Sequence, residues 1–189
     1  AAKWACHGTH IALHAAHEYI KSMETLYNCP FDSLDALGSL DNFDDLDIRD
    51  HKDWFMAYAT ELCAKEKTGQ QGDVAPMLLK LRHSHAVLEN AKRIVAGEKF
   101  SPALGRVCLL AALYHDIGRF EQYLRYHTFK DRLSCDHGRL GVRILKHERR
   151  LSEEAPATRK AVLAAVGLHN RFALPSGLAE VTAAATHVV

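Results

Sequence analysis

Four histidines and one aspartate carry the strongest chemical signal in this chain. His83, His115, His137 and His169 follow one another at intervals of 32, 22 and 32 residues, and Asp116 comes directly after the second of them. Each histidine lies at or near one end of a run of apolar residues with helical spacing. A buried polar group needs a partner, so packing alone gives no reason to direct several imidazoles into one helical core. We therefore expect a buried metal centre.

The segment that ends in LLAALYHDIG is the most informative of these runs. One continuous helical face, at positions i, i+3, i+4, i+7, i+8 and i+11, holds Leu104, Val107, Cys108, Ala111, Ala112 and His115. Three leucines make the other side apolar too, which predicts a central helix. A metal ion would take the neutral imidazole and the carboxylate oxygen of the His-Asp pair together. Nitrogen and carboxylate ligands suit manganese, iron, cobalt, nickel or zinc better than calcium, and the sequence does not choose among these five.

Helical patterns run through the whole chain, which predicts an all-α fold. The expected helices cover about 3–27, 51–66, 74–97, 136–148 and the start of one at 178–189. Another helix begins at Ser101-Pro102, and Gly118 stops it or at least loosens its last turn. A short helical turn follows at 119–125, and Ser152 caps a helix that runs to about residue 169. Seven aspartates in residues 31–50 predict an acidic connector. Asp136 stands where the N-cap of the helix carrying His137 should be.

Composition and charge exclude several functional classes. Apolar residues make up 48% of the chain, charged residues 25%, and the formal net charge is +1, so neither nucleic acid nor a membrane is expected as the main partner. Five cysteines without a CxxC pair indicate free thiols in a reducing compartment, which predicts a cytoplasmic protein. No stretch approaches the roughly 20 apolar residues of a membrane span. The sequence does not indicate the oligomeric state, and a homo-oligomer stays open.

Two segments of the chain carry a family resemblance. KLRHSHAVLENA and YHDIGRFEQYLRYHTFKDRLSCDHGRLGVRIL resemble the HD-domain superfamily of metal-dependent phosphohydrolases, and more narrowly an uncharacterised bacterial branch of it. The resemblance covers about residues 80–171 and implies a single-domain helical bundle in which separate helices hold a metal. We divide the chain into an N-terminal helical extension with the acidic connector (1–72) and an HD domain (73–189), packed as one unit.

The resemblance implies a set of metal ligands. They are His83, His115, Asp116, His137 and His169. The first ligand is His83 rather than His85, because the family's flanking residues match Lys80, Ser84, Val87 and Ala91. The last two histidines match those that hold a second ion in some branches, bridged to the first by the aspartate. One or two divalent ions are therefore expected.

The chain departs from the family at one ligand. The family closes its first metal site with a distant aspartate, on the helix after the LHNR-like segment. No aspartate follows Asp136, and the sequence ends at Val189, within the start of that helix. Either the ligand lies beyond Val189, in which case the C-terminal part of the domain is truncated, or the protein binds metal without it.

The predicted reaction is hydrolysis of a phosphate ester by a metal-activated hydroxide. Asp116 would bridge the ions and could accept a proton. Arg119 could bind phosphate oxygens in fork geometry, although a solvated helix-end cation is an equal alternative, and Asn170 and Arg171 are further candidates for contacting the substrate. The expected partner is a small-molecule phosphate ester, a nucleotide or a related phosphomonoester or diester. The alternative function is a non-catalytic module that binds a nucleotide or another ligand in a degenerate HD site.

Four further histidines lie near the N-terminus. His7, His10, His14 and His17 fall within one narrow stripe of the expected first helix. The stripe could be a polar surface against the bundle or a partner, a second metal site, or an overhang above the catalytic pocket. The sequence leaves these three interpretations open.

Overall fold

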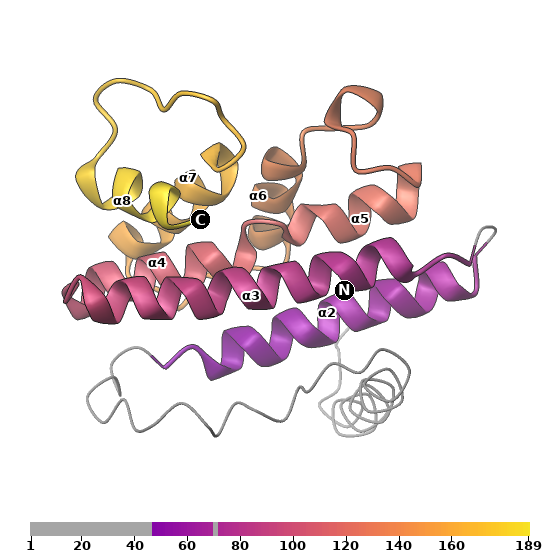
Figure 1. Cartoon of the computed structure of the whole chain (residues 1–189), viewed down its shortest axis with the longest axis horizontal. Helices are drawn as coiled ribbons and strands as arrows, with labels where there is room; N and C mark the ends of the chain where they lie inside the picture. Colours follow the sequence, from indigo (N-terminus) through magenta and orange to yellow (C-terminus); the bar gives the residue numbers. More distant parts are fainter. Residues whose placement is uncertain (1–46, 70–71) are drawn as a thin grey trace. The chain divides into compact units, whose positions relative to one another are not determined.

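The computed structural model describes residues 47–69 and 72–189, and these residues are helical with no strand among them (Figure 1). They belong to one compact unit. The expected all-α helical bundle is confirmed. The helix at 3–27, most of the acidic connector and the four N-terminal histidines lie outside the described residues. The boundary at residue 72 also stays a prediction.

The helices follow one another along the chain with short connections. They are α2 (Arg49–Lys67), α3 (Ala75–Gly97), α4 (Pro102–Tyr114), α5 (Ile117–Tyr126), the 3-10 helix η3 (Asp131–Leu133), α6 (His137–His147), α7 (Pro156–Leu168) and α8 (Glu180–Val188). The two long helices α2 and α3 lie side by side, as Figure 1 shows. Among the described helices, none combines the length and the apolar character that a membrane crossing needs.

Helix α4 lies at the centre of this unit. Every residue from Val107 to Tyr114 is buried, and the helix packs against α2, α3, α7 and α8. A helix that is apolar all round has no face to offer to water, so other helices must surround it. The residues that directly follow Tyr114 therefore emerge inside the bundle.

Two helix starts match the sequence-based expectations. Ser101 Oγ accepts a hydrogen bond from the Leu104 amide at 3.4 Å, at the start of α4. Asp136 Oδ1 accepts one from the Arg139 amide at 2.9 Å, at the start of α6. Both are N-caps, which satisfy amide groups that the first helical turn leaves without a carbonyl partner.

Other expected helix boundaries were wrong. The central helix ends at Tyr114 instead of Gly118, and residues 117–126 form a full helix instead of a short turn. Gly118 lies inside α5, where a Cβ would be 2.2 Å from the carbonyl oxygen of His137, so its role is to let α5 and α6 approach closely. Helix α7 begins at Pro156 and not at Ser152, because residues before Pro156 form turns and a proline fits the first helical position.

Candidate metal centre

The structure brings all five predicted metal ligands together. His83 comes from α3, His115 and Asp116 lie between α4 and α5, His137 opens α6, and His169 follows α7. Their ligand atoms form two groups, one of His83, His115 and Asp116 and one of Asp116, His137 and His169. Within each group the atoms lie within 4.8 Å of one another. Because Asp116 belongs to both groups, its two carboxylate oxygens can serve two neighbouring positions.

The group of His137 and His169 has the spacing of a coordination site. Their Nε2 atoms are 3.0 Å apart, and they lie 3.4 Å and 3.7 Å from Asp116 Oδ1. Ligand atoms about 2.1 Å from a shared ion lie roughly 3.0 Å apart at a right angle and roughly 3.4 Å apart at a tetrahedral angle. The first two distances fit ligands around one cation, and the third fits with a wider angle at the ion.

Hydrogen bonds on the far side of each ring fix the tautomers in this group. His137 Nδ1 lies 2.7 Å from Asp131 Oδ2, and His169 Nδ1 lies 2.8 Å from the carbonyl oxygen of Val166. Both oxygens can only accept here, so each Nδ1 carries a proton, and in the neutral form of each ring the lone pair of Nε2 points at the other ring. These lone pairs and the carboxylate oxygen repel one another unless a proton or a metal cation lies among them. The donor chemistry of the group thus fits a divalent ion.

The group of His83 and His115 is more open. His115 Nδ1 donates to the Ala112 carbonyl at 2.8 Å, which leaves Nε2 as a buried atom without a hydrogen-bond partner, 3.5 Å from Asp116 Oδ2. His83 Nε2 lies 3.8 Å from the same oxygen. The side chain of His83 is 48% exposed against 4% for His115, so the centre opens to solvent on the α3 side. His115, Asp116 and His137 are buried as expected, His169 is half-buried and His83 is exposed.

The charge states of the ligands also suit a metal. Burial alone would raise the pKa of Asp116, but the polar groups of His115, His169 and Lys80 around the carboxylate outweigh burial and hold that pKa well below its usual range. Burial lowers the pKa of His83 and of His137, and neighbouring cations lower both further. An ionised carboxylate and neutral imidazoles are the forms that bind metal.

Two cationic side chains contact Asp116 as well. Lys80 Nζ lies 2.9 Å from Oδ2, and Arg119 Nε lies 3.4 Å from Oδ1. Arg119 Nη1 also donates to Gln122 Oε1, the Phe129 carbonyl and Asp131 Oδ1, at 2.9, 2.5 and 2.8 Å. These bonds tie the segment that follows α5 to α5 itself, and they hold Asp131 against His137. Whether Arg119 contacts phosphate stays a prediction.

The other two predicted substrate contacts lie at the exposed rim. Asn170 Nδ2 is 3.4 Å from Asp131 Oδ2, and Arg171 Nη2 is 3.3 Å from Asp136 Oδ2. Both residues directly follow His169 and are exposed. Their present partners are carboxylates, and their contacts with substrate stay predictions.

Three polar residues of the centre had no role assigned from the sequence. Lys80 served only to align the motif, while Gln122 and Asp131 were residues of the family-like stretch without a function. Gln122 is fully buried, and its Nε2 donates to Asp131, Ser134 and the Cys135 carbonyl at 3.0, 2.8 and 2.9 Å. The sequence spacing could have pointed to Gln122, because Arg119 and Gln122 are three residues apart and so share a helical face.

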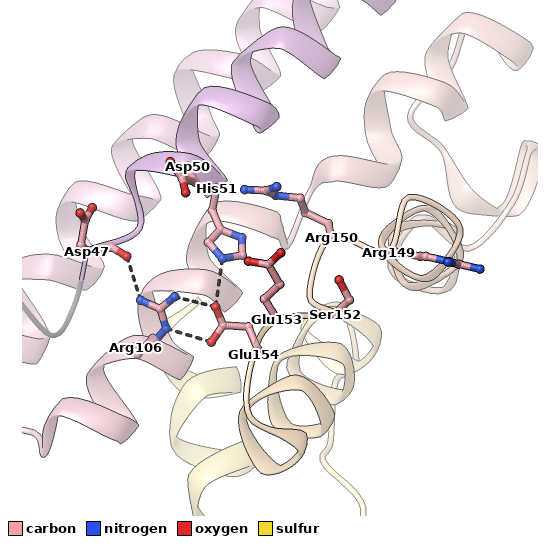
Figure 2. Close-up of a pocket in the computed structure, with 9 residues that line it drawn as sticks. All are labelled: Asp47, Asp50, His51, Arg106, Arg149, Arg150, Ser152, Glu153 and Glu154. Carbon is pink, nitrogen blue, oxygen red and sulfur yellow. Dashed lines mark hydrogen bonds and ion pairs between the residues drawn. The ribbon is translucent and has the colours of Figure 1, made fainter. Parts of the chain in front are cut away.

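A separate polar pocket shares no lining residue with the metal centre. Its volume is about 420 Å³, and Figure 2 shows its lining by Asp47, Asp50, His51, Arg106, Arg149, Arg150, Ser152, Glu153 and Glu154. Arg106 holds Glu154 through two hydrogen bonds of 2.9 and 2.6 Å, and His51 Nε2 lies 3.0 Å from Glu154 Oε1. These contacts join α2, α4 and the turns before α7.

Comparison with protein families identifies one match. The family model described as HD domain matches residues 81–185, which is more than half of the chain and includes all five candidate ligands. Comparisons with curated proteins and with solved structures give no significant match.

Proposed function

This chain belongs to the HD domain family, whose superfamily consists of metal-dependent phosphohydrolases, and we propose that it hydrolyses a phosphate ester of a nucleotide or a related small molecule. The observation that carries the proposal is the pair of ligand groups that share Asp116. In two-metal hydrolases such a pair holds ions that clamp the attacking and the leaving oxygen of a phosphoryl transfer. When bound, divalent ions supply Lewis acidity and acidify water near neutral pH.

The protein's own residues have distinct tasks in this proposal. A carboxyl with the lowered pKa of Asp116 keeps its charge and does not readily take a proton, so we assign it the bridging position. Backbone carbonyls hold His115 and His169 in fixed tautomers, and Asp131 does the same for His137. Substrate would approach from the exposed side of His83, because the other ligands are buried or nearly so.

The proposed substrate is a small molecule in a reducing, cytoplasmic setting. Cys63, Cys108 and Cys135 are free thiols, of which the first two are buried. A net charge of +1 gives little overall electrostatic attraction for a nucleic acid strand. The phosphate of a nucleotide would meet the candidate cations Lys80, Arg119 and Arg171.

One observation favours the alternative of a non-catalytic binding module. Lys80 contacts Asp116 Oδ2, and the first group offers three ligands among the described residues, at wider spacings than the second. A chain that kept only the second group would bind one ion and could hold a phosphate ester without cleaving it.

Phosphate release from a panel of nucleotides with added manganese tests the proposal. We expect release by the unchanged protein and none by Asp116→Ala, which should also lose bound metal in elemental analysis. His147→Ala serves as the matched control, since His147 is an exposed histidine at the end of α6. Full activity of Asp116→Ala would end the proposal. Metal binding without release of phosphate from any nucleotide or simple phosphomonoester would favour the binding module.

A further inference from the structure

Lys80 lies where it would meet an incoming metal ion. It is on α3, one turn before His83, and its Nζ atom is 2.9 Å from Asp116 Oδ2. The same oxygen faces His83 Nε2 at 3.8 Å and His115 Nε2 at 3.5 Å. The ammonium group of Lys80 is therefore hydrogen-bonded to Asp116 Oδ2, the oxygen that would bind an ion together with His83 and His115.

An ammonium and a divalent cation do not coexist easily on this oxygen. The side chain of Asp116 is 4% exposed and that of Lys80 is 22% exposed, so little water separates the charges. Like charges a few ångströms apart in such surroundings repel strongly. The second group differs, because its oxygen, Asp116 Oδ1, has a longer contact of 3.4 Å with Arg119 Nε. The two positions are thus unequal in this chain.

Lys80 can move away while Arg119 is held in place. The four-carbon stem of lysine is flexible, whereas Arg119 Nη1 is fixed by three acceptors. Lys80 Nζ already lies 5.7 Å from the centre of the Phe129 ring, so a cation–π contact with this ring can persist when the ammonium leaves Asp116.

We propose that the Lys80 ammonium holds Asp116 Oδ2 until an ion bound by His83, His115 and Asp116 displaces it, and that the displaced ammonium then binds the phosphate of the substrate. This inference rests on the proposed function for the identity of the substrate. Lysine binds phosphate as a point charge, without the fork geometry that a fixed arginine requires. The protein would accordingly fill the position of His137 and His169 first and the position of His83 and His115 second.

Lys80→Met tests both parts because it keeps the stem and removes the charge. Titration calorimetry with manganese should give two unequal binding constants for the unchanged protein. In Lys80→Met the affinity of the weaker manganese site should rise by about tenfold. This is the order expected for removing one competing charge-assisted hydrogen bond. With manganese saturating, inorganic phosphate should bind about tenfold more weakly to the variant. A merely structural lysine would not move the two affinities in opposite directions.

Lys92→Met is the matched control, because Lys92 is on the same helix and pairs with Glu89 at 2.6 Å. It should leave both affinities unchanged. If Lys80→Met does not fold, as judged by circular dichroism, Lys80→Gln takes its place with the same expectations. A variant that binds two ions where the unchanged protein binds one also supports the proposal.

The inference is overturned if the weaker manganese site of the Lys80 variant has the same or a lower affinity than in the unchanged protein. It is also overturned if phosphate binding is undiminished. These results can be told apart from failure of the proposed function. A protein that hydrolyses nucleotides yet shows neither effect keeps its function and loses this role for Lys80. A protein that shows both effects but releases no phosphate from any ester is a binding module with Lys80 in its site.

Discussion

Asp131 is a residue that would affect metal binding without touching the ion. Its Oδ2 accepts a hydrogen bond from His137 Nδ1 at 2.7 Å, and its Oδ1 accepts bonds from Arg119 and Gln122 at 2.8 and 3.0 Å. Burial raises the pKa of Asp131, but the bonds from Gln122 and His137 outweigh burial and lower it overall. The carboxylate therefore stays charged and holds the imidazole with its Nε2 lone pair toward Asp116.

Asp131→Asn should weaken manganese binding by about tenfold, because a neutral amide oxygen is a poorer acceptor and makes His137 a poorer ligand. Calorimetric titration measures the change, and Asp53→Asn on the exposed side of α2 is the control. Equal affinities in the two variants would show that Asp131 has no part in presenting His137 to metal.

The ligands could be predicted from the sequence, but their supporting residues could not. His83, His115, His137 and His169 each accompany an apolar helical stripe, and a stripe tells which side chains face the core. Asp131 lies in an irregular segment, where no periodicity tells which way a side chain points. The contact between His51 and Glu154 joins residues 103 positions apart, and neither residue belongs to a recognisable motif.

Gly118 controls how closely two helices of the site approach each other. An added Cβ would lie 2.2 Å from the His137 carbonyl oxygen and 2.8 Å from the Gly141 amide nitrogen. Both are backbone atoms, so α5 and α6 would have to separate. Gly118→Ala should lower the free energy of unfolding by about 1–3 kcal/mol or more, the range for overpacked sites, and weaken metal binding because His137 moves with α6.

Urea unfolding measures the stability effect, and Gly97→Ala is the control. No atom lies within 4 Å of a Cβ at Gly97, the last residue of α3, so alanine there should raise stability by up to about 1 kcal/mol. A Gly118→Ala protein as stable as the original would mean that α5 and α6 can separate without loss.

The boundary between α4 and α5 shows why a helix end was missed. Apolar residues continue from Leu113 through Ile117 and Phe120, so the pattern across a window of residues gives no break. The helix is interrupted near one residue, Asp116, with φ −101° and ψ 13°. Because this interruption lies within the apolar pattern, periodicity does not reveal it. It matters for the site, since Asp116 makes no capping bond and its carboxylate is left for the imidazoles.

At the scale of the whole molecule, the hydrogen-bonded network of His51, Arg106 and Glu154 links stability to pH. Hydrogen bonds from Arg106 are the main cause that lowers the pKa of Glu154 below its ordinary 4.5. The stabilisation is therefore present above pH 4.5 and lost as the pH falls through the lowered value. Burial and the charge of Arg150 lower the pKa of His51 from 6.5, despite its contact with Glu154. As the pH falls, His51 is protonated in the unfolded chain before it is protonated in the folded chain. The free energy of unfolding therefore also falls as the pH drops below 6.5.

Glu154→Gln should flatten the acid part of this profile and cost about 1–3 kcal/mol at neutral pH, because Arg106 loses a charged acceptor. Urea unfolding at a series of pH values measures both effects. Glu153→Gln, an exposed neighbour in the same pocket, should keep the original profile. A profile for Glu154→Gln with the original slope between pH 5 and pH 3 would exclude this network as the cause.

Metal should stabilise the folded chain because its candidate ligands come from separate segments. His83 is on α3, Asp116 follows α4, His137 is on α6 and His169 follows α7, and these segments meet only in the folded chain. A ligand at about 100 times its dissociation constant adds roughly 2.7 kcal/mol of stability when it binds the folded state alone. For a chain of this size we expect Tm to fall by about 5–10 °C when manganese is removed with a chelator.

Asp116→Ala should abolish the difference in Tm between manganese-loaded and chelated protein, while His147→Ala should retain it. A Tm that rises equally with manganese in the Asp116→Ala protein would show that the ion binds elsewhere, and the two ligand groups would then not be the metal centre of this chain.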